Sequence, residues 1–97
     1  MQLIWTERAL AQFDRILDNI AWECGIAVTE RWQDKIDAAL AIVPEHPFIG
    51  SEVREFRRED IREVGVPPYR VIYRVCRDCC EILAVLHCRQ SLSADEF

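Results

Sequence analysis

Residues 69–87 read YRVIYRVCRDCCEILAVLH, and this stretch carries the strongest structural signal in the chain. Its two runs, 69–75 and 81–87, are rich in β-branched, aromatic and other apolar residues, which are typical of strands. Between them lies the turn Arg77-Asp78. A two-residue turn there pairs Arg74 with Glu81, and this opposite-charge cross-strand pair favours the register. The stretch therefore predicts a β-hairpin.

The period of two along a strand assigns every side chain of this hairpin to one face of the sheet. A four-residue turn would shift the pairing by two residues and leave the faces unchanged. One face holds Tyr69, Val71, Tyr73, Val75, Cys80, Ile82, Ala84 and Leu86. The other holds Arg70, Ile72, Arg74, Glu81, Leu83, Val85, His87 and Arg89. We expect the first face to form the core. The second gathers Arg70, His87 and Arg89 toward one end and is a candidate working surface.

Two helices are predicted before the hairpin. Leu3-Ile4-Trp5 indicates a short strand, and Thr6 follows as a helix N-cap. Apolar residues then recur in steps of three and four at Leu10, Phe13, Leu17, Ile20 and Cys24. Gly25 ends this helix. A second helix carries Val28, Trp32, Ile36, Ala39 and Val43, and Pro44 ends it. Because the link is short, the two must form an antiparallel helical hairpin.

The middle of the chain adds one more strand. Residues 44–58 indicate a loop, Ile61-Arg62-Glu63-Val64 indicates a strand, and Pro67-Pro68 ends it. The predicted order is β-α-α-β-β-β. This is an α+β fold in which an antiparallel sheet packs against the N-terminal helical hairpin. With 97 residues, the chain is predicted to be a single domain covering residues 1–97.

Composition and charge narrow the class of protein. Hydrophobic residues make up 51% of the chain and charged residues 30%, as in ordinary globular domains. The net charge of −5 argues against electrostatic binding to nucleic acid, so we expect no direct DNA binding. The longest apolar run, Ala38–Val43, is far below the ~18 residues that span a bilayer. The N-terminus has no signal-peptide pattern, so we expect a cytoplasmic protein without membrane contact.

The chain has five cysteines, at Cys24, Cys76, Cys79, Cys80 and Cys88. An odd number without a secretion signal does not indicate a disulfide framework. The run Cys76-x-x-Cys79-Cys80 resembles half a zinc site, but His87 lies roughly 20 Å away at the far end of the next strand. We therefore expect reduced structural thiols and no metal or cofactor. A metal site and a disulfide at the hairpin tip are the minor alternatives.

Three blocks stand out when the sequence is read in order. They are Ile4-Trp5-Thr6-x-x-Ala9, then REV at 62–64 with PYRVIYRV at 68–75, and finally ILAVLHCR at 82–89. Together they resemble the RelE/ParE superfamily, the toxins of bacterial toxin–antitoxin pairs. The resemblance covers nearly the whole chain. It implies the same β-α-α-β-β-β plan for the fold.

The resemblance implies a choice between two toxin chemistries. RelE-like members cut mRNA in the ribosome, with cationic groups on the phosphate and a base at the ribose 2′-OH. That site would fall on Arg70, His87 and Arg89. ParE-like members inhibit DNA gyrase by binding. The chain has no Lys in residues 61–64, no Tyr after Tyr73 and a negative net charge. These departures favour the ParE-like branch, a non-enzymatic plasmid-stabilisation toxin. An mRNA endonuclease and a non-toxic antitoxin-binding relative are the alternatives.

The same resemblance implies the partners. We expect a ParD-like antitoxin that neutralises the chain and assembles it into an oligomer, with DNA gyrase as the target. Arg62, Arg70, His87 and Arg89 are the candidate target-binding residues, and no catalytic residue is favoured. The plainer alternatives are an Arg70 ion pair with Glu63 and a locally hydrogen-bonded His87.

Trp22 is a candidate partner-binding residue for a separate reason. At 100° per residue, it points about 170° away from the apolar stripe of the first predicted helix. It is therefore either exposed or covered by something outside that stripe. Exposed Trp is enriched at interfaces. Trp32, in contrast, lies within the stripe of the second helix and is expected in the core, as are Tyr69 and Tyr73.

Overall fold

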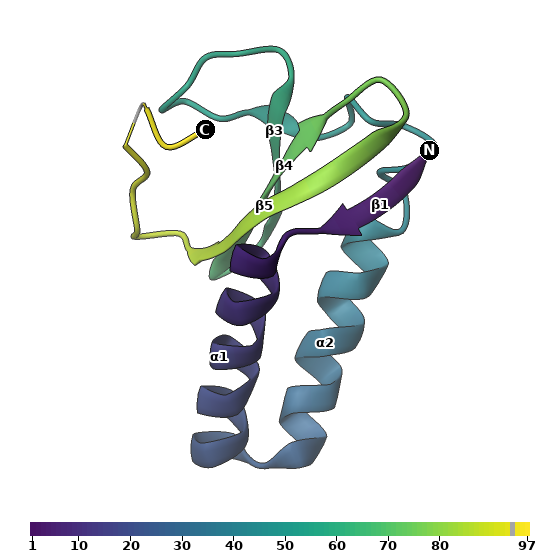
Figure 1. Cartoon of the computed structure of the whole chain (residues 1–97). Helices are drawn as coiled ribbons and strands as arrows, with labels where there is room; N and C mark the ends of the chain where they lie inside the picture. The colour runs from purple at the N-terminus through teal and green to yellow at the C-terminus, as the bar shows by residue number, and fades with distance from the viewer. Residues whose placement is uncertain (94) are drawn as a thin grey trace.

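The computed structural model describes residues 1–93 and 95–97 (Figure 1). Its elements are β1 (Gln2–Trp5), α1 (Glu7–Cys24), α2 (Ile26–Leu40), β2 (Ser51–Glu52), β3 (Ile61–Val66), β4 (Tyr69–Val75) and β5 (Cys79–His87). The predicted α+β class and the predicted order of the longer elements are confirmed. The addition is β2, a two-residue strand inside the segment 44–58 that the sequence indicates as loop.

The strands form one sheet in the order β1-β5-β4-β3-β2. The pairs from β2 through β5 are antiparallel, as predicted. β1 instead runs parallel to β5, with Gln2 opposite Cys79 and Trp5 opposite Ile82, so the sheet is mixed. Local sequence pattern carries no information on this pairing, because it joins the two ends of the chain.

The predicted hairpin of β4 and β5 is confirmed at its tip. The Cys76 N–H donates to the Cys79 carbonyl at 2.8 Å, which closes the two-residue turn. Arg74 lies opposite Glu81, and their side chains form an ion pair at 3.6 Å.

A β-bulge changes the faces farther from the tip. Tyr73 pairs with Ile82, but the next residue, Ile72, pairs with Ala84, so Leu83 is the extra residue. Beyond such a bulge the alternation of side chains shifts by one residue. Val85 therefore joins the helix-facing core, whereas Ala84 and Leu86 join the opposite face. His87 lies opposite Tyr69, so the prediction that His87 and Arg70 share a face is wrong.

The helical hairpin begins at a cap. The Thr6 hydroxyl accepts the Ala9 N–H at 3.2 Å and donates to the Ile82 carbonyl at 2.7 Å, which ties the start of α1 to β5. Gly25, with φ 88°, ends α1 and directly precedes α2. Figure 1 shows the two helices side by side, with their joined end projecting away from the sheet.

Only part of the predicted α1 stripe is buried. Phe13 is buried and Leu17 is half-buried, but Leu10 and Cys24 are exposed. Ala9 is fully buried in their place, because the first turns of α1 are the ones that face the sheet. On α2, Trp32 packs edge-on against Tyr69 at 5.4 Å between ring centroids. Both side chains are half-buried and lie outside the buried clusters, so of the aromatic residues expected in the core only Tyr73 is fully buried. The α2 helix ends at Leu40, so the buried Val43 follows it rather than belonging to it.

Two apolar clusters lie on the two faces of the sheet. The helix-facing cluster contains Ala9, Phe13, Ile36, Leu40, Val43, Val66, Val71, Tyr73, Cys80, Ile82 and Val85. The other contains Val53, Ile61, Ile72, Leu83, Ala84, Leu86 and Leu92, with Phe56 and Phe97 packed against it. Leu92 and Phe97 belong to the C-terminal segment, so that segment covers the face that the helices leave open. Neither α1 nor α2 combines the length and the hydropathy needed to cross a membrane.

Candidate functional site

Arg70 lies on β4 and is 6% exposed. Its Nη1 and Nη2 atoms donate to the two carboxylate oxygens of Glu55, at 2.9 and 3.0 Å. Nε and Nη2 both donate to Glu63 Oε2, and Nη1 also donates to the Gln90 carbonyl at 3.3 Å. A guanidinium carries five N–H groups. Every donor of Arg70 is therefore engaged within the chain, and the predicted ion pair with Glu63 is present.

Glu55 is the second centre of this Arg70 network, which comprises Arg70, Glu55, Glu63, the Gln90 carbonyl and the Leu92 N–H. Its Oε2 also accepts the Leu92 N–H at 3.1 Å. The hydrogen bonds from Arg70 lower the pKa of Glu55 from 4.5 to about 2, although burial opposes the shift. The hydrogen bonds that Arg70 donates to Glu55 and Glu63 in turn raise the pKa of Arg70, although burial opposes the shift. Glu55 and Arg70 are therefore both charged throughout the neutral range.

His87, at the end of β5, is half-buried and faces Tyr69, with 6.1 Å between ring centroids. Its Nδ1 accepts the Arg89 N–H at 3.1 Å, so a neutral ring carries its proton on Nε2. Gln90 completes the turn: its Oε1 accepts the His87 N–H at 2.9 Å, and its own N–H donates to the His87 carbonyl at 2.9 Å. The local hydrogen-bonding role considered for His87 is present.

Arg62, on β3, contacts the segments that lie before and after β2. Its Nε donates to the Glu59 carbonyl at 2.9 Å, and Nη1 donates to the Gly50 carbonyl at 3.2 Å. The guanidinium also covers the Phe48 ring at 5.1 Å. Arg62 and Arg70 therefore belong to separate sets of contacts.

Arg89 and Trp22 are both exposed, in different parts of the fold. Arg89 follows β5 beside the Arg70 network. Trp22 lies near the end of α1 and is 90% exposed, and Ile26 at the start of α2 is 69% exposed. The sequence-based inference that Trp22 points away from the core is confirmed. These two apolar side chains lie on the joined end of the helical hairpin, which Figure 1 shows projecting from the sheet.

The predicted set of Arg62, Arg70, His87 and Arg89 thus does not converge on one point. The hollow beside Arg70 has a volume of about 500 Å³. It is lined by Glu52, Arg54, Glu63, Gly65, Pro67, Tyr69, Arg70 and Cys88. Glu55 completes the network but was missed, because its place depends on how residues 53–60 fold over β3 and β4. The alternation of acids and arginines over residues 52–63 was the available signal.

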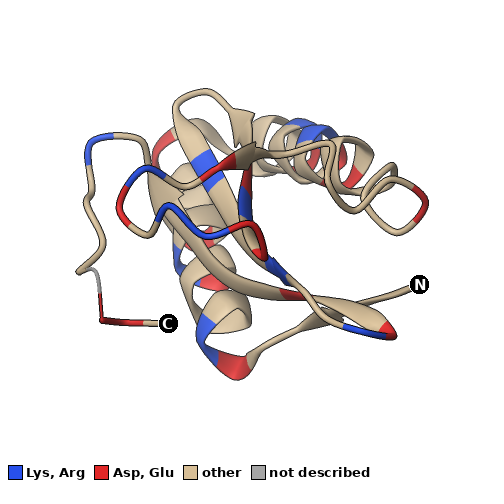
Figure 2. Ribbon diagram, turned by 90° about the horizontal axis from the view of Figure 1, so that it is seen from above, with Lys and Arg blue, Asp and Glu red and all other residues tan. Residues whose placement is uncertain are grey.

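Charges of opposite sign are interleaved over this part of the molecule. Figure 2 shows acidic and basic positions alternating along the ribbon, as they do in residues 52–63. A surface of this kind suits contact with a protein better than contact with a phosphate backbone. Among the described residues, no cluster of three or more His, Cys, Asp or Glu could hold a metal ion.

The comparisons with known proteins concern the family and the overall fold of the chain. Residues 3–92 match the family described as the ParE toxin of the type II toxin–antitoxin system parDE. The chain belongs to this family. As a ParE-type toxin of a type II toxin–antitoxin system, it retains the family pattern over almost its whole length.

A solved structure shows the same fold at low sequence identity. The chain is similar to one described as the chromosomal ParDE toxin–antitoxin system from P. aeruginosa, with a TM-score of 0.75 and 21% identity. The match covers 90% of this chain and 95% of that one. The comparison with curated proteins gives no match.

Proposed function

We propose that this ParE toxin inhibits DNA gyrase by binding it in the cytoplasm, without cleaving a bond, and that a ParD-like antitoxin neutralises it. In this proposal the antitoxin also joins toxin chains into an oligomer. The chain itself does not bind DNA, in line with its net charge of −5. The contacts to the target come from the exposed Arg89 and from the half-buried Arg62 and His87.

The Arg70 network is the observation that carries the choice of binding over cleavage. Cleavage of RNA needs a cationic side chain that is free to meet the charged phosphate. All five N–H groups of Arg70 already donate within the chain, to Glu55, Glu63 and Gln90. Turning Arg70 toward a phosphate would leave two carboxylates without their partner. Arg70 therefore supports the target-binding surface by holding its shape.

A supercoiling assay tests the proposal. Relaxed plasmid, ATP and gyrase are incubated with the purified chain. We expect supercoiling to fail and linear DNA to accumulate, and we expect added antitoxin to restore supercoiling. Arg89→Ala should weaken this inhibition, whereas Arg77→Ala, an exposed arginine at the β4–β5 turn, is the matched control. A gel shift at low salt checks that the chain alone does not retard DNA.

The alternatives give different results in a parallel translation assay. Unchanged gyrase activity together with cut ribosome-bound mRNA would identify an endonuclease and overturn the proposal. Unchanged gyrase and intact mRNA would identify a non-toxic antitoxin-binding relative, which also contradicts it. Pulse labelling of cells that express the chain without antitoxin distinguishes the same alternatives in vivo. If the chain inhibits gyrase, DNA synthesis should fail before protein synthesis.

We further propose that Trp22 contacts the antitoxin. A 90% exposed Trp next to an exposed Ile26 offers a large apolar anchor, and such anchors dominate binding energy at interfaces. Trp22→Ala should weaken antitoxin binding by roughly tenfold or more. Leu10→Ala, which removes another exposed apolar side chain from α1, is the control. Unchanged antitoxin affinity and assembly state in a stably folded Trp22→Ala chain would refute the contact.

A further inference from the structure

The tip of the β4–β5 hairpin brings two cysteines face to face. Cys76 and Cys79 flank the two-residue turn, and the Cys76 N–H donates to the Cys79 carbonyl at 2.8 Å. Val75 and Cys80 form the next pair of the ladder, so Cys76 lies directly opposite Cys79. Directly opposed residues of a hydrogen-bonded antiparallel pair have Cα atoms about 5.5 Å apart. That separation is within the range of about 4.4–6.8 Å that a disulfide spans.

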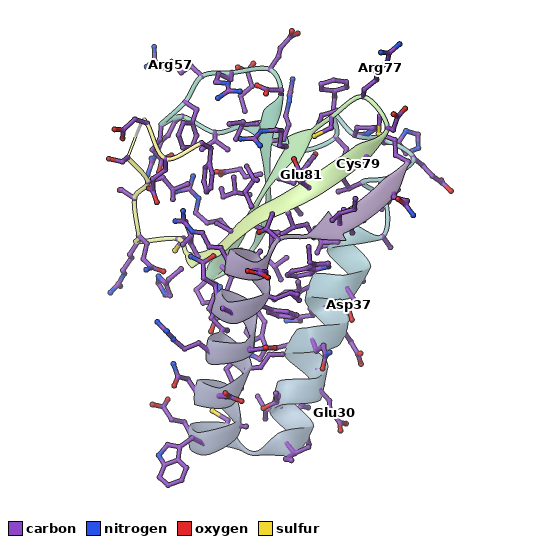
Figure 3. The ribbon with its side chains drawn as sticks, in the orientation of Figure 1. Glu30, Asp37, Arg57, Arg77, Cys79 and Glu81 are labelled. Atoms are coloured by element: carbon purple, nitrogen blue, oxygen red, sulfur yellow. The ribbon has the colours of Figure 1, made fainter. Side chains whose placement is uncertain are left out.

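The two thiols differ in their surroundings. The Cys76 Sγ donates to Glu81 Oε1 at 3.3 Å, and Glu81 also pairs with Arg74 at 3.6 Å. Burial, this hydrogen bond and the adjoining Cys79 thiol raise the pKa of Cys76 to about 12. Figure 3 shows Cys79 and Glu81 on β5, with Arg77 at the tip of the hairpin. Glu81 thus holds Cys76 as a thiol, which leaves the first attack to Cys79.

We propose that Cys76 and Cys79 form a redox-active dithiol that a small-molecule disulfide, such as oxidised glutathione, converts into an intramolecular disulfide. The Cys79 thiolate attacks one sulfur of the small disulfide, whose S–S bond breaks, and one small thiolate leaves. Cys76 then attacks the Cys79 sulfur of the mixed disulfide, and the second small thiolate leaves. Each small thiolate takes up the proton that one cysteine has lost. The two cysteines are oxidised, and the small disulfide is reduced to two thiols.

The other cysteines are placed so that they do not compete for this bond. Cys80 is fully buried in the helix-facing cluster, where its Sγ lies 3.8 Å from Met1 Sδ. Because side chains alternate along a strand, Cys80 points to the opposite face from Cys79. Cys24 and Cys88 are exposed, at the end of α1 and after β5. They are accessible to glutathione, so we expect mixed adducts on them and no bond to the hairpin tip.

Thiol mapping of the full chain tests this proposal independently of gyrase inhibition. The reduced chain is equilibrated with graded ratios of oxidised to reduced glutathione and quenched with acid, and its free thiols are alkylated in denaturant. Mass spectrometry should find a species with two fewer alkylated cysteines whose disulfide maps to Cys76 and Cys79. Adducts on Cys24 and Cys88 without this crosslink would overturn the proposal. A crosslink that pairs Cys80 with either residue would overturn it too.

Serine variants test the order of the two attacks. Cys76→Ser should stop at the mixed disulfide on Cys79, because the resolving thiol is missing. Cys79→Ser should leave Cys76 free of glutathione at neutral pH. The double variant Cys24→Ser and Cys88→Ser is the matched control and should form the crosslink like the parent chain. A glutathione adduct on Cys76 in the Cys79→Ser variant would contradict the proposed order.

Discussion

Arg70 connects separate parts of the chain through one guanidinium. From β4 it binds Glu63 on β3, Glu55 after β2, and the Gln90 carbonyl after β5. A buried charge of this kind is tolerated only where its partners satisfy it completely. Arg70 therefore fixes the position of the C-terminal segment, which begins beside Arg89, the exposed candidate for target contact.

The first prediction concerns the loss of this guanidinium. Arg70→Met keeps the stem of the side chain but leaves Glu55 and Glu63 without their partner. Removing one member of a buried pair costs about 3–5 kcal/mol. We expect a fall of that size in the free energy of unfolding measured in urea. Arg77→Met, at an exposed turn, is the control and should change it by less than about 0.5 kcal/mol. Similar values for both variants would contradict a supporting role for Arg70.

The second prediction concerns pH and Glu55. Its pKa is about 2 in the folded chain, below its usual 4.5, chiefly because Arg70 donates to the carboxylate. A carboxylate that ionises more readily in the folded state stabilises the fold above its unfolded pKa, and this stabilisation is lost as the pH falls through the folded pKa. The free energy of unfolding should therefore decrease from pH 4.5 to about 2. Glu55→Gln should flatten this decrease in urea titrations across that range. An equally steep decrease in the variant would refute the assignment.

At the scale of the elements, Thr6 at the start of α1 makes both a local helix cap and a hydrogen bond to a strand far away in the sequence. Thr6 caps the helix through its hydroxyl oxygen and donates the hydroxyl hydrogen to β5. Its sequence context predicts only the cap. The bond to the Ile82 carbonyl depends on β1 lying beside β5.

The third prediction follows from this double role. Loss of an N-cap costs about 0.5–2 kcal/mol, and Thr6→Ala also removes the partly buried hydrogen bond to the Ile82 carbonyl of β5. We expect a destabilisation near the upper end of that range in thermal and urea unfolding. Thr29→Ala is the matched control, because the Thr29 hydroxyl only bonds back to the Gly25 carbonyl on the exposed side of α2. Equal effects of the two changes would show that the Thr6 contacts are unimportant.

The fourth prediction concerns the segment between α2 and β2. The Gly50 N–H donates to the Tyr73 hydroxyl at 3.0 Å, and that hydroxyl donates to the Pro47 carbonyl at 2.7 Å. A Cβ at Gly50 would lie 2.6 Å from the Tyr73 hydroxyl and 2.7 Å from the Glu63 carbonyl. Gly50→Ala should therefore cost about 1–3 kcal/mol by overpacking.

Gly65 on β3 provides the control for this substitution. An added Cβ there meets nothing within 4 Å, so Gly65→Ala should leave stability unchanged or slightly raised. Urea unfolding of both variants checks the difference. A Gly50→Ala chain as stable as the Gly65→Ala chain would show that the segment moves aside without cost.

At the scale of the whole molecule, the sheet is covered on both faces by different means. The helical hairpin covers one face, and Leu92 and Phe97 help to cover the other. Arg8, on α1, pairs with Glu96 at 2.6 Å and lies over the Phe97 ring, while Arg58 donates to the Phe97 carbonyl at 2.9 Å. The C-terminal segment is therefore part of the folded domain.

The fifth prediction tests that cover. Leu92 is 7% exposed, so Leu92→Ala removes buried apolar surface and should cost about 2 kcal/mol or more. Ser91→Ala, one residue earlier and exposed, should change stability by less than about 0.5 kcal/mol. The free energy of unfolding of each full-length variant is the measurement. A Leu92→Ala chain of parental stability would show that the segment does not seal the face.

The sequence by itself determined the features that depend on neighbouring residues. The turn at Arg77-Asp78, the Arg74–Glu81 pair, the Thr6 cap and the helix end at Gly25 all follow from chemistry within a few residues. The three family blocks also indicated the RelE/ParE superfamily, because they preserve residue types in order, and the absent Lys and Tyr together with the negative net charge favoured its ParE-like branch. Trp22 was correctly placed away from the core because helical periodicity fixes its direction.

Tertiary structure decided what depends on distant segments. The parallel pairing of β1 with β5 joins the two ends of the chain, and the bulge at Leu83 reversed the expected faces of Val85 and His87. Arg70 became a buried structural cation only because Glu55 and residues 90–92 close over it. The physical reason is the same in each case. The free energy of a buried charge or a shifted strand depends on the groups that surround it in space, and the order of residues along the chain does not specify which groups these are.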